Sequence, residues 1–302
     1  GEIKDFLGVR VVNDRANGTI TMTQEGLIAS VLKQVGLPVE EDKRTVQPKF
    51  TPADGILHAD TVGQERQLPW NYRSVIGKLM FIANNTRPDI AFAVHQAARY
   101  STNPKKSHEI AVKHICRYLW LTKDKGLICR PNGDGELNAY CDSDFAGRWH
   151  QSTTHLRESV LSRTGYVLMF CGCPILWASK LQTEVALSST EAELYALSSC
   201  MRIILPMRRV FKEISQLSFV KNLTLHGSKI LSHAIKPTKV CEDNQSCLIV
   251  ATSDHIKPRT RHLATKYFRF RDEVQAGRIQ VVKIHTKENV SDIFTKPLVK
   301  DV

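Results

Sequence analysis

Four acidic positions fall where the sequence predicts that strands end or helices begin, the places at which α/β sheets usually build their sites. They are Asp142, Asp243, Asp292 and one of the two glutamates Glu191 and Glu193. Carboxylates that lie close together repel one another unless cations separate them, so a cluster of four implies hard divalent metal ions. Two such ions can activate a water and stabilise the leaving oxygen in phosphodiester hydrolysis. The alternative is that all four are ordinary helix caps and surface acids.

Helix geometry distinguishes the two glutamates. Residues two apart on a helix point about 200° away from each other, so only one of the pair can face a sheet. Glu193 shares its stripe with the small or apolar residues Ala196, Leu197 and Cys200, whereas the stripe of Glu191 includes a tyrosine, a serine and an arginine. We therefore expect Glu193 to point towards the sheet.

The elements that must position these acids follow from hydrophobic patterning in the second half of the chain. Strands are expected at 137–142, 164–170, 174–178, 238–243 and 278–284, and helices at 189–214, 244–252, 261–275 and from about 290 onwards. Three strands followed by alternating helices and strands predict an α/β fold, a mixed sheet with flanking helices. Asp142 and Asp243 would each close a strand, and Asp292 would lie in the first turn of the last helix. Pro206 should kink or split the long helix.

The first part of the chain has a different organisation. Two β-rich runs around a Gly/Asn/Asp turn predict a small hairpin, and a helix follows it. A region rich in Pro and charged residues indicates a linker or a long loop, and three further helices are expected at 72–84, 90–100 and 107–121. We predict four segments, which are 1–36, 37–66, 67–130 and 135–298.

Charge and composition limit the classes of function. Lys and Arg number 42 against 30 Asp and Glu, a net charge of +12 that favours a polyanionic partner, nucleic acid before a membrane surface. Hydrophobic residues make up 42%, which excludes disorder throughout, and no apolar run approaches the roughly 18 residues of a membrane span. The eight cysteines are scattered, so buried free thiols in a reducing compartment are expected. The first residue is Gly1, and we expect a piece of a longer chain.

Basic and aromatic residues are interleaved between Ser253 and His285. Phosphate contacts are predicted for Arg259, Arg261 and Lys266, because Arg and Lys neutralise phosphates and release their counterions. The alternative is a solvated basic helix face with buried aromatic residues. Lys105 and Lys106 form a second, weaker candidate patch.

Several ordered motifs resemble those of one family. In the second half they are Ala139-Tyr-Cys-Asp-Ser-Asp-Phe-Ala-Gly147, Arg163-Thr-Gly-Tyr-Val167, Ile175-Leu-Trp177, Ala186-Leu-Ser-Ser-Thr-Glu-Ala-Glu193, Asp243-Asn-Gln-Ser246 and Asp292-Ile-Phe-Thr-Lys-Pro-Leu298. They resemble the ribonuclease H domain at the C-terminus of copia-type retrotransposon polyproteins. Tyr72-Arg-Ser-Val-Ile-Gly77, Arg87-Pro-Asp-Ile-Ala-Phe-Ala93 and Asn103-Pro-Lys-Lys-Ser-His108 resemble the same family, and Phe6-Leu-Gly8 looks like the end of its reverse transcriptase domain.

The resemblance implies a ribonuclease H-like mixed sheet, preceded by a hairpin-plus-helix remnant and a helical thumb or connection region. The family's metal-binding acids fall on Asp142, Glu193, Asp243 and Asp292, with Asp144 a weaker rival for the first place. The implied cofactor is two Mg²⁺, with Mn²⁺ as a possible substitute. The implied reaction is cleavage of the RNA strand of an RNA–DNA hybrid.

The resemblance carries further expectations about the site and its surroundings. Asn244 and Gln245 are expected to contact the nucleic acid, and His285 to have a minor role in catalysis. The expected partner besides the hybrid is the rest of the Pol polyprotein, its reverse transcriptase palm and fingers, in a cytoplasmic virus-like particle or the nucleus. No polymerase activity is expected, because no paired-aspartate motif precedes Phe6.

Two other functions remain open at this level. One is a nucleic-acid clamp whose nuclease has decayed, against which the complete set of acids argues. The other is a DNA-strand transferase on the same fold, against which the position of Glu193 as the second acid in order argues.

Overall fold

The computed structural model describes residues 3–40, 46–132, 135–217, 224–225, 228–229, 236–253 and 264–298. The chain forms two compact units, one comprising Gly1–Ile128 with Lys296–Val302 and the other Cys129–Thr295. The finer division into four segments remains a prediction. Among the described residues, no helix is long and apolar enough to cross a membrane.

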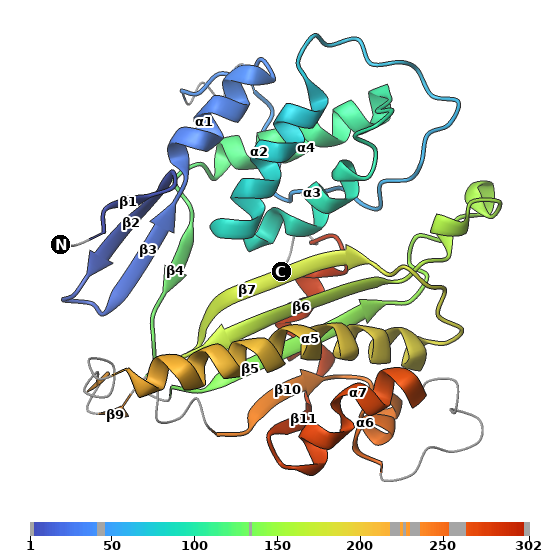
Figure 1. The fold of residues 1–302 in the computed structure, drawn as a ribbon. Coiled ribbons are helices and arrows are strands. Elements are labelled where there is room, and N and C mark those ends of the chain that lie inside the picture. The colour runs from blue at the N-terminus through green and yellow to red at the C-terminus, as the bar shows by residue number, and fades with distance from the viewer. Residues whose placement is uncertain are drawn as a thin grey trace. The chain divides into compact units, whose positions relative to one another are not determined.

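The first unit combines a small sheet with helices (Figure 1). Its strands, in the order β1-β2-β3-β4, are β1 (Asp5–Phe6), β2 (Val9–Asp14), β3 (Thr19–Thr23) and β4 (Leu127–Cys129), whose last residue falls in the second unit. Its helices are α1 (Glu25–Gln34), α2 (Tyr72–Asn85), the 3-10 turn η1 (Pro88–Ile90), α3 (Ala91–Ala98) and α4 (Lys106–Leu121). The predicted hairpin is β2 and β3, which pair antiparallel. The helices pack through fully buried side chains such as Leu79, Val94 and Leu119.

Residues 46–70 are held by hydrogen bonds and ion pairs to helices α3 and α4 and to the segment between these helices. The backbone N–H of Leu57 donates to Gln96 (2.8 Å), and the carbonyl of Thr51 lies 2.8 Å from a ring nitrogen of His114. The guanidinium of Arg66 pairs with Glu109 at 3.3 Å and stacks over the ring of Trp70. Polar contacts thus hold this part of the chain against the helices of the first unit.

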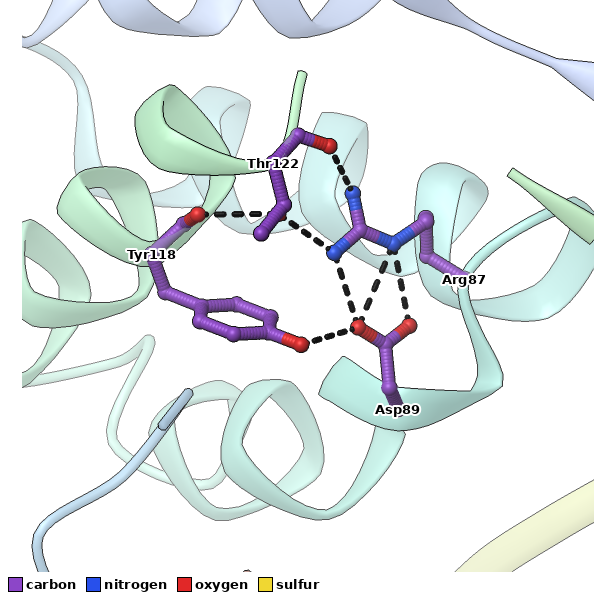
Figure 2. A network of polar contacts seen from close by, with 4 residues as sticks. All are labelled: Arg87, Asp89, Tyr118 and Thr122. Atoms are coloured by element: carbon purple, nitrogen blue, oxygen red, sulfur yellow. Dashed lines mark hydrogen bonds and ion pairs between the residues drawn. The ribbon is translucent and has the colours of Figure 1, made fainter. Parts of the chain in front are cut away.

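A buried polar network joins the turn after α2 to the end of α4 (Figure 2). Arg87, only 3% exposed, donates to both carboxylate oxygens of Asp89 and to the carbonyl and hydroxyl oxygens of Thr122. The Tyr118 hydroxyl donates to the same carboxylate at 2.7 Å, and burial raises the pKa of Tyr118 to about 12. A planar guanidinium can make all these bonds at once, which a lysine cannot.

The second unit is built on a five-stranded mixed sheet of order β11-β10-β5-β6-β7 (Figure 1). Its strands are β5 (Leu137–Asp144), β6 (Arg163–Phe170), β7 (Cys173–Leu181), β10 (Thr238–Glu242) and β11 (Ile279–Lys283). The first three are successively antiparallel, and β10 is parallel to both β5 and β11. This order and these directions are those of the ribonuclease H-like fold, as predicted.

Helices and short turns complete this unit. They are α5 (Ser189–Gln216), α6 (Gln245–Thr252), α7 (Ala264–Gln275), the turns η2 (Gln151–Thr153), η3 (Arg157–Ser159), η6 (Thr286–Glu288) and η7 (Val290–Phe294), and the two-residue strands β8 (Thr224–Leu225) and β9 (Ser228–Lys229). The core lies where α5 packs on the sheet, with Leu197 and Cys200 against Cys141, Leu168 and Val240.

Four sequence expectations about these elements differ from the structure in detail. β5 continues to Asp144, so Asp142 lies inside the strand, and β10 ends at Glu242, so Asp243 follows it. The last predicted helix, from about 290 onwards, is instead the short 3-10 turn η7. Pro206 does not split the long helix, which runs unbroken as α5, because the buried stripe on this helix outweighs the one backbone hydrogen bond that a proline removes.

The Arg87 network should stabilise the first unit. We expect Arg87→Lys to lower the free energy of unfolding by about 2–3 kcal/mol, since the lysine leaves polar groups of Asp89 and Thr122 without their donors. Urea denaturation of the whole chain measures this. Arg73→Lys, at an exposed arginine that donates to the carbonyl of Ser101, is the matched control and should change stability by less than about 0.5 kcal/mol. Equal effects of the two changes would contradict this role.

Candidate metal centre

Three of the four predicted acids come together at one edge of the second unit's sheet. Asp142, Glu193 and Asp243 each offer a carboxylate oxygen, and these oxygens all lie within 4.8 Å of one another. Asp142 and Glu193 are buried and Asp243 is half-buried. The parallel register of β5 and β10 pairs Tyr140 with Cys241, and continuing it by two residues brings Asp243 level with Asp142.

The start of α5 explains why Glu193, and not Glu191, reaches the other acids. Ser188 caps the helix, its hydroxyl accepting from the backbone N–H of Glu191 at 3.1 Å. The Glu191 carboxylate turns back and accepts from the N–H of Leu187 at 2.7 Å. Such reciprocal bonding fixes the first turn of a helix. Glu191 is therefore used in capping, although it is buried like Glu193.

Electrostatic repulsion within the cluster is strong. Burial, together with the negative charges of Glu242, Asp142 and Asp243, raises the pKa of Glu193 to about 10. One carboxylate oxygen of Glu193 is buried and has no hydrogen-bond partner among the described residues. An orphaned buried oxygen among carboxylates is what a hard cation would satisfy, because Mg²⁺ takes oxygen ligands. The residues present thus fit a divalent metal ion.

Glu242 is a fourth carboxylate beside the cluster, and sequence reasoning missed it. It is fully buried, and it accepts from the Cys141 thiol (3.3 Å) and from the backbone N–H of Asn244 (3.0 Å). Burial raises the pKa of Glu242 to about 8. Strand alternation with Val240 places it on the covered face of the sheet, a signal that its neighbour Asp243 obscured.

The segment that carries Asp292 is bound across β5. The Thr295 hydroxyl donates to the carboxylate of Asp142, and the Asn289 side chain donates to the carbonyl of Cys141 at 3.0 Å. Gly165 on β6 allows this approach, because a Cβ there would lie 2.8 Å from the Cβ of Phe294. Asp292 itself is not in the group of oxygens within 4.8 Å, and neither is Asp144.

The remaining predicted site residues of the second unit lie as follows. His285 is exposed, and its Nδ1 accepts from the backbone N–H of Lys287 at 3.2 Å. Asn244 caps α6 by accepting from the N–H of Cys247, and Gln245 is exposed at the start of that helix. Arg259 and Arg261 fall outside the described residues, as does the side chain of Lys266 in α7.

Lys105 and Lys106 belong to the first unit. The ammonium of Lys105 pairs with Glu65, and its side chain is 11% exposed. The ammonium of Lys106 donates to Gln64 at 3.0 Å. Both lysines therefore hold the loop of residues 46–70, and Lys105 offers little surface to a ligand.

Comparisons with known proteins point to one family. The chain is 32% identical, over 305 residues and 98% of its length, to the retrovirus-related Pol polyprotein from transposon TNT 1-94 of Nicotiana tabacum. It is 30% identical over 98% of its length to that of transposon RE1, and 31% over 85% to that of transposon RE2, both of Arabidopsis thaliana. It spans 20%, 18% and 16% of these three relatives respectively. No protein-family model matches the chain.

Solved structures similar to this chain include RNase H1 from Halobacterium salinarum NRC-1 and LC11-RNase H1. Both are 13% identical, cover 53% of this chain and 94% and 92% of their own, and give TM-scores of 0.35 and 0.33. The order and direction of the strands carry the fold assignment. Fold and site together define a ribonuclease H-like domain with a cluster of carboxylates. The chain belongs to the Pol polyproteins of copia-type retrotransposons, of which it is one region.

The buried Glu193 should make stability depend on pH. Its folded pKa of about 10 lies above the ordinary 4.5, so the folded state keeps the proton to higher pH than the unfolded chain. The stabilisation of the folded state by this proton is fully present below pH 4.5 and is lost as the pH rises towards 10. With divalent ions chelated, the free energy of unfolding should fall more steeply between about pH 5 and about pH 8 in the wild type than in Glu193→Gln.

Urea denaturation at several pH values measures this difference. Glu191→Gln, on the same helix turn, should keep the wild-type slope. Added Mg²⁺ should raise the stability of the wild type more at high pH than at low pH, because it competes with protons for the carboxylates. A slope that is the same in Glu193→Gln and the wild type would show that Glu193 is not protonated in the folded chain.

Proposed function

We propose that the second unit is a metal-dependent endonuclease that cleaves the RNA strand of RNA–DNA hybrids during reverse transcription. The observation that carries the proposal is the assembly of Asp142, Glu193 and Asp243, with ligand oxygens within 4.8 Å, at one edge of a ribonuclease H-like sheet. The family to which the chain belongs supports it. An assembled triad also argues against a decayed, purely binding role.

The carboxylates would hold two Mg²⁺, or Mn²⁺ in their place, with Asp292 as a looser fourth ligand. Bound there, the ions would supply activation of a water and stabilisation of the leaving oxygen. The chain's own part is to fix its ligands. The Thr295 hydroxyl orients Asp142, and the ammonium of Lys283 holds the backbone carbonyl of Asp243 at 2.7 Å. Ligands held by such supporting contacts need little reorganisation when metal or substrate binds.

Recognition of the hybrid would depend on its shape and its 2′-hydroxyls, not on base sequence. Gln245 is exposed and lies two residues after Asp243, at the start of α6. Arg259, Arg261 and Lys266 would contact phosphates, in keeping with the net charge of +12. The rest of the polyprotein, with the polymerase palm and fingers, would be the protein partner, inside a virus-like particle or the nucleus.

Removing single metal ligands should abolish hydrolysis. We expect Asp142→Asn and Glu193→Gln each to lower kcat on a labelled RNA–DNA hybrid by at least about a thousandfold, or about 4 kcal/mol of barrier. Hybrid binding should survive, because neither change removes a positive charge. Mg²⁺-dependent cleavage and equilibrium binding measure the two effects separately.

The control is Glu191→Gln, which keeps an oxygen for the N–H of Leu187 and should leave kcat within about twofold of the wild type. Loss of activity in Glu191→Gln but not in Glu193→Gln would reverse the assignment of the two glutamates.

His285 should contribute little to turnover. Its ring is exposed and accepts a local hydrogen bond from the backbone N–H of Lys287, and among the described residues it is not part of the carboxylate cluster. We expect His285→Ala to slow kcat by no more than roughly tenfold, about 1.4 kcal/mol. A hundredfold loss with metal affinity unchanged would place this side chain in the chemistry.

A further inference from the structure

Four large apolar side chains are exposed in two loops of the second unit. They are Phe145 (42% exposed), Trp149 (58%), Val185 (37%) and Leu187 (79%), and we call them the apolar rim. Single exposed apolar residues are common, but a group of them marks an interaction surface. Nothing in the triad's chemistry uses these side chains.

The sheet register places the apolar rim beside the carboxylates. Asp144, the last residue of β5, pairs with Arg163 at the start of β6, and Arg163 pairs with Leu181 at the end of β7. The loop after β5 and the loop after β7 therefore leave the sheet at the same edge (Figure 1). Asp142 lies two residues before the end of β5 and Glu193 four residues into α5, so the same edge carries the triad.

One hydrogen bond joins the loop after β5 to the loop after β7, and another fixes the backbone at Trp149. The guanidinium of Arg157 donates to the carbonyl of Thr183 at 2.9 Å. The N–H of Trp149 donates to the carbonyl of Ala146, which has a left-handed backbone at φ 49°. In the same turn Gly147 lies so close to the Asp144 carboxylate that a Cβ would overlap it. The backbone that carries Trp149 is thus tied to the end of the catalytic strand.

We propose that Trp149, with Phe145 four residues before it in the same loop, forms a binding surface on which a nucleotide next to the cleavage site packs its sugar or base. The inference rests on the proposed nuclease function and adds a contact to it. A strand whose phosphate reaches Asp142 and Glu193 must pass over the loops at that edge. Aromatic rings pack on sugars and bases irrespective of sequence, which suits an enzyme that reads shape.

The chemistry around the rim favours nucleic acid over protein as its occupant. The side chains of His150, His155 and Arg157 in the same loop are exposed, and Glu158 is the loop's acid. The chain as a whole carries +12. Apolar rings among basic and imidazole groups, continuous with a site for phosphodiesters, match a polyanion with flat faces.

The test uses the full chain carrying Asp142→Asn, so that the hybrid is bound but not cut. Fluorescence anisotropy with a labelled RNA–DNA hybrid gives Kd across a salt series. Adding Trp149→Ala should weaken binding by about tenfold or more, the scale of one lost stacking contact. The slope of log Kd against log salt should stay the same, because no phosphate contact is lost.

Two further variants separate stacking from a general loss of structure. Trp149→Phe keeps an aromatic face and should bind within about threefold of the parent chain. Ile175→Ala removes another exposed apolar side chain, 39% exposed against 58% for Trp149, near the opposite end of β7 and should leave Kd unchanged. Thermal unfolding of each variant checks that it is still folded.

The outcomes are distinguishable from failure of the proposed function. If the Asp142→Asn chain binds hybrid and adding Trp149→Ala changes nothing, or Ile175→Ala weakens binding equally, the inference is overturned while the nuclease stands. In that case the rim serves a protein partner. If the wild-type chain neither binds nor cleaves hybrid, the proposed function fails and the inference fails with it.

Discussion

Mutual repulsion of buried carboxylates is the constraint on which the second unit depends. Asp142, Glu193 and Asp243 are brought within 4.8 Å, and Glu242 lies fully buried beside them. Left to themselves such groups separate or take up protons, and the raised pKa values of Glu193 and Glu242 express that cost. The energy that holds them together comes from elsewhere in the fold, from the parallel pairing of β5 with β10 and from the apolar stripe of α5 on the sheet. A site of this kind trades stability for function.

The contacts around the triad are arranged to hold backbone and carboxylates in place. Thr295 bonds to the carboxylate of Asp142, and Glu242 bonds to the backbone just beyond Asp243. Capping at Ser188 fixes the first turn of the helix that carries Glu193. Asp142 is thus oriented by a direct hydrogen bond, whereas Asp243 and Glu193 are positioned through the backbone that carries them.

A structural feature could be predicted from the sequence where a local pattern of residues determines it. The choice of Glu193 over Glu191 needed only the helical period, and the mixed sheet needed only the order of strands and helices. Glu242 was missed because its burial depends on what covers β10, and an acid beside Asp243 gives no sign of facing inwards. The unbroken α5 was missed because packing overrode the local effect of Pro206. Residues 46–70 are held by partners such as His108 and His114, which lie 50 and 63 residues from the residues they contact and which no periodicity indicates.

The bond between Thr295 and Asp142 joins residues 153 positions apart. Chains are synthesised from the N-terminus, so β5 and α5 exist well before the segment that crosses them. Contacts of such long range also form late in folding, because the entropy of closing the loop is lost before the contact is gained. The carboxylate cluster is therefore completed only when the last segment of its own unit has been synthesised. A chain that ends before residue 289 has Asp142, Glu193 and Asp243 but lacks the hydrogen bonds that Asn289 and Thr295 donate to β5.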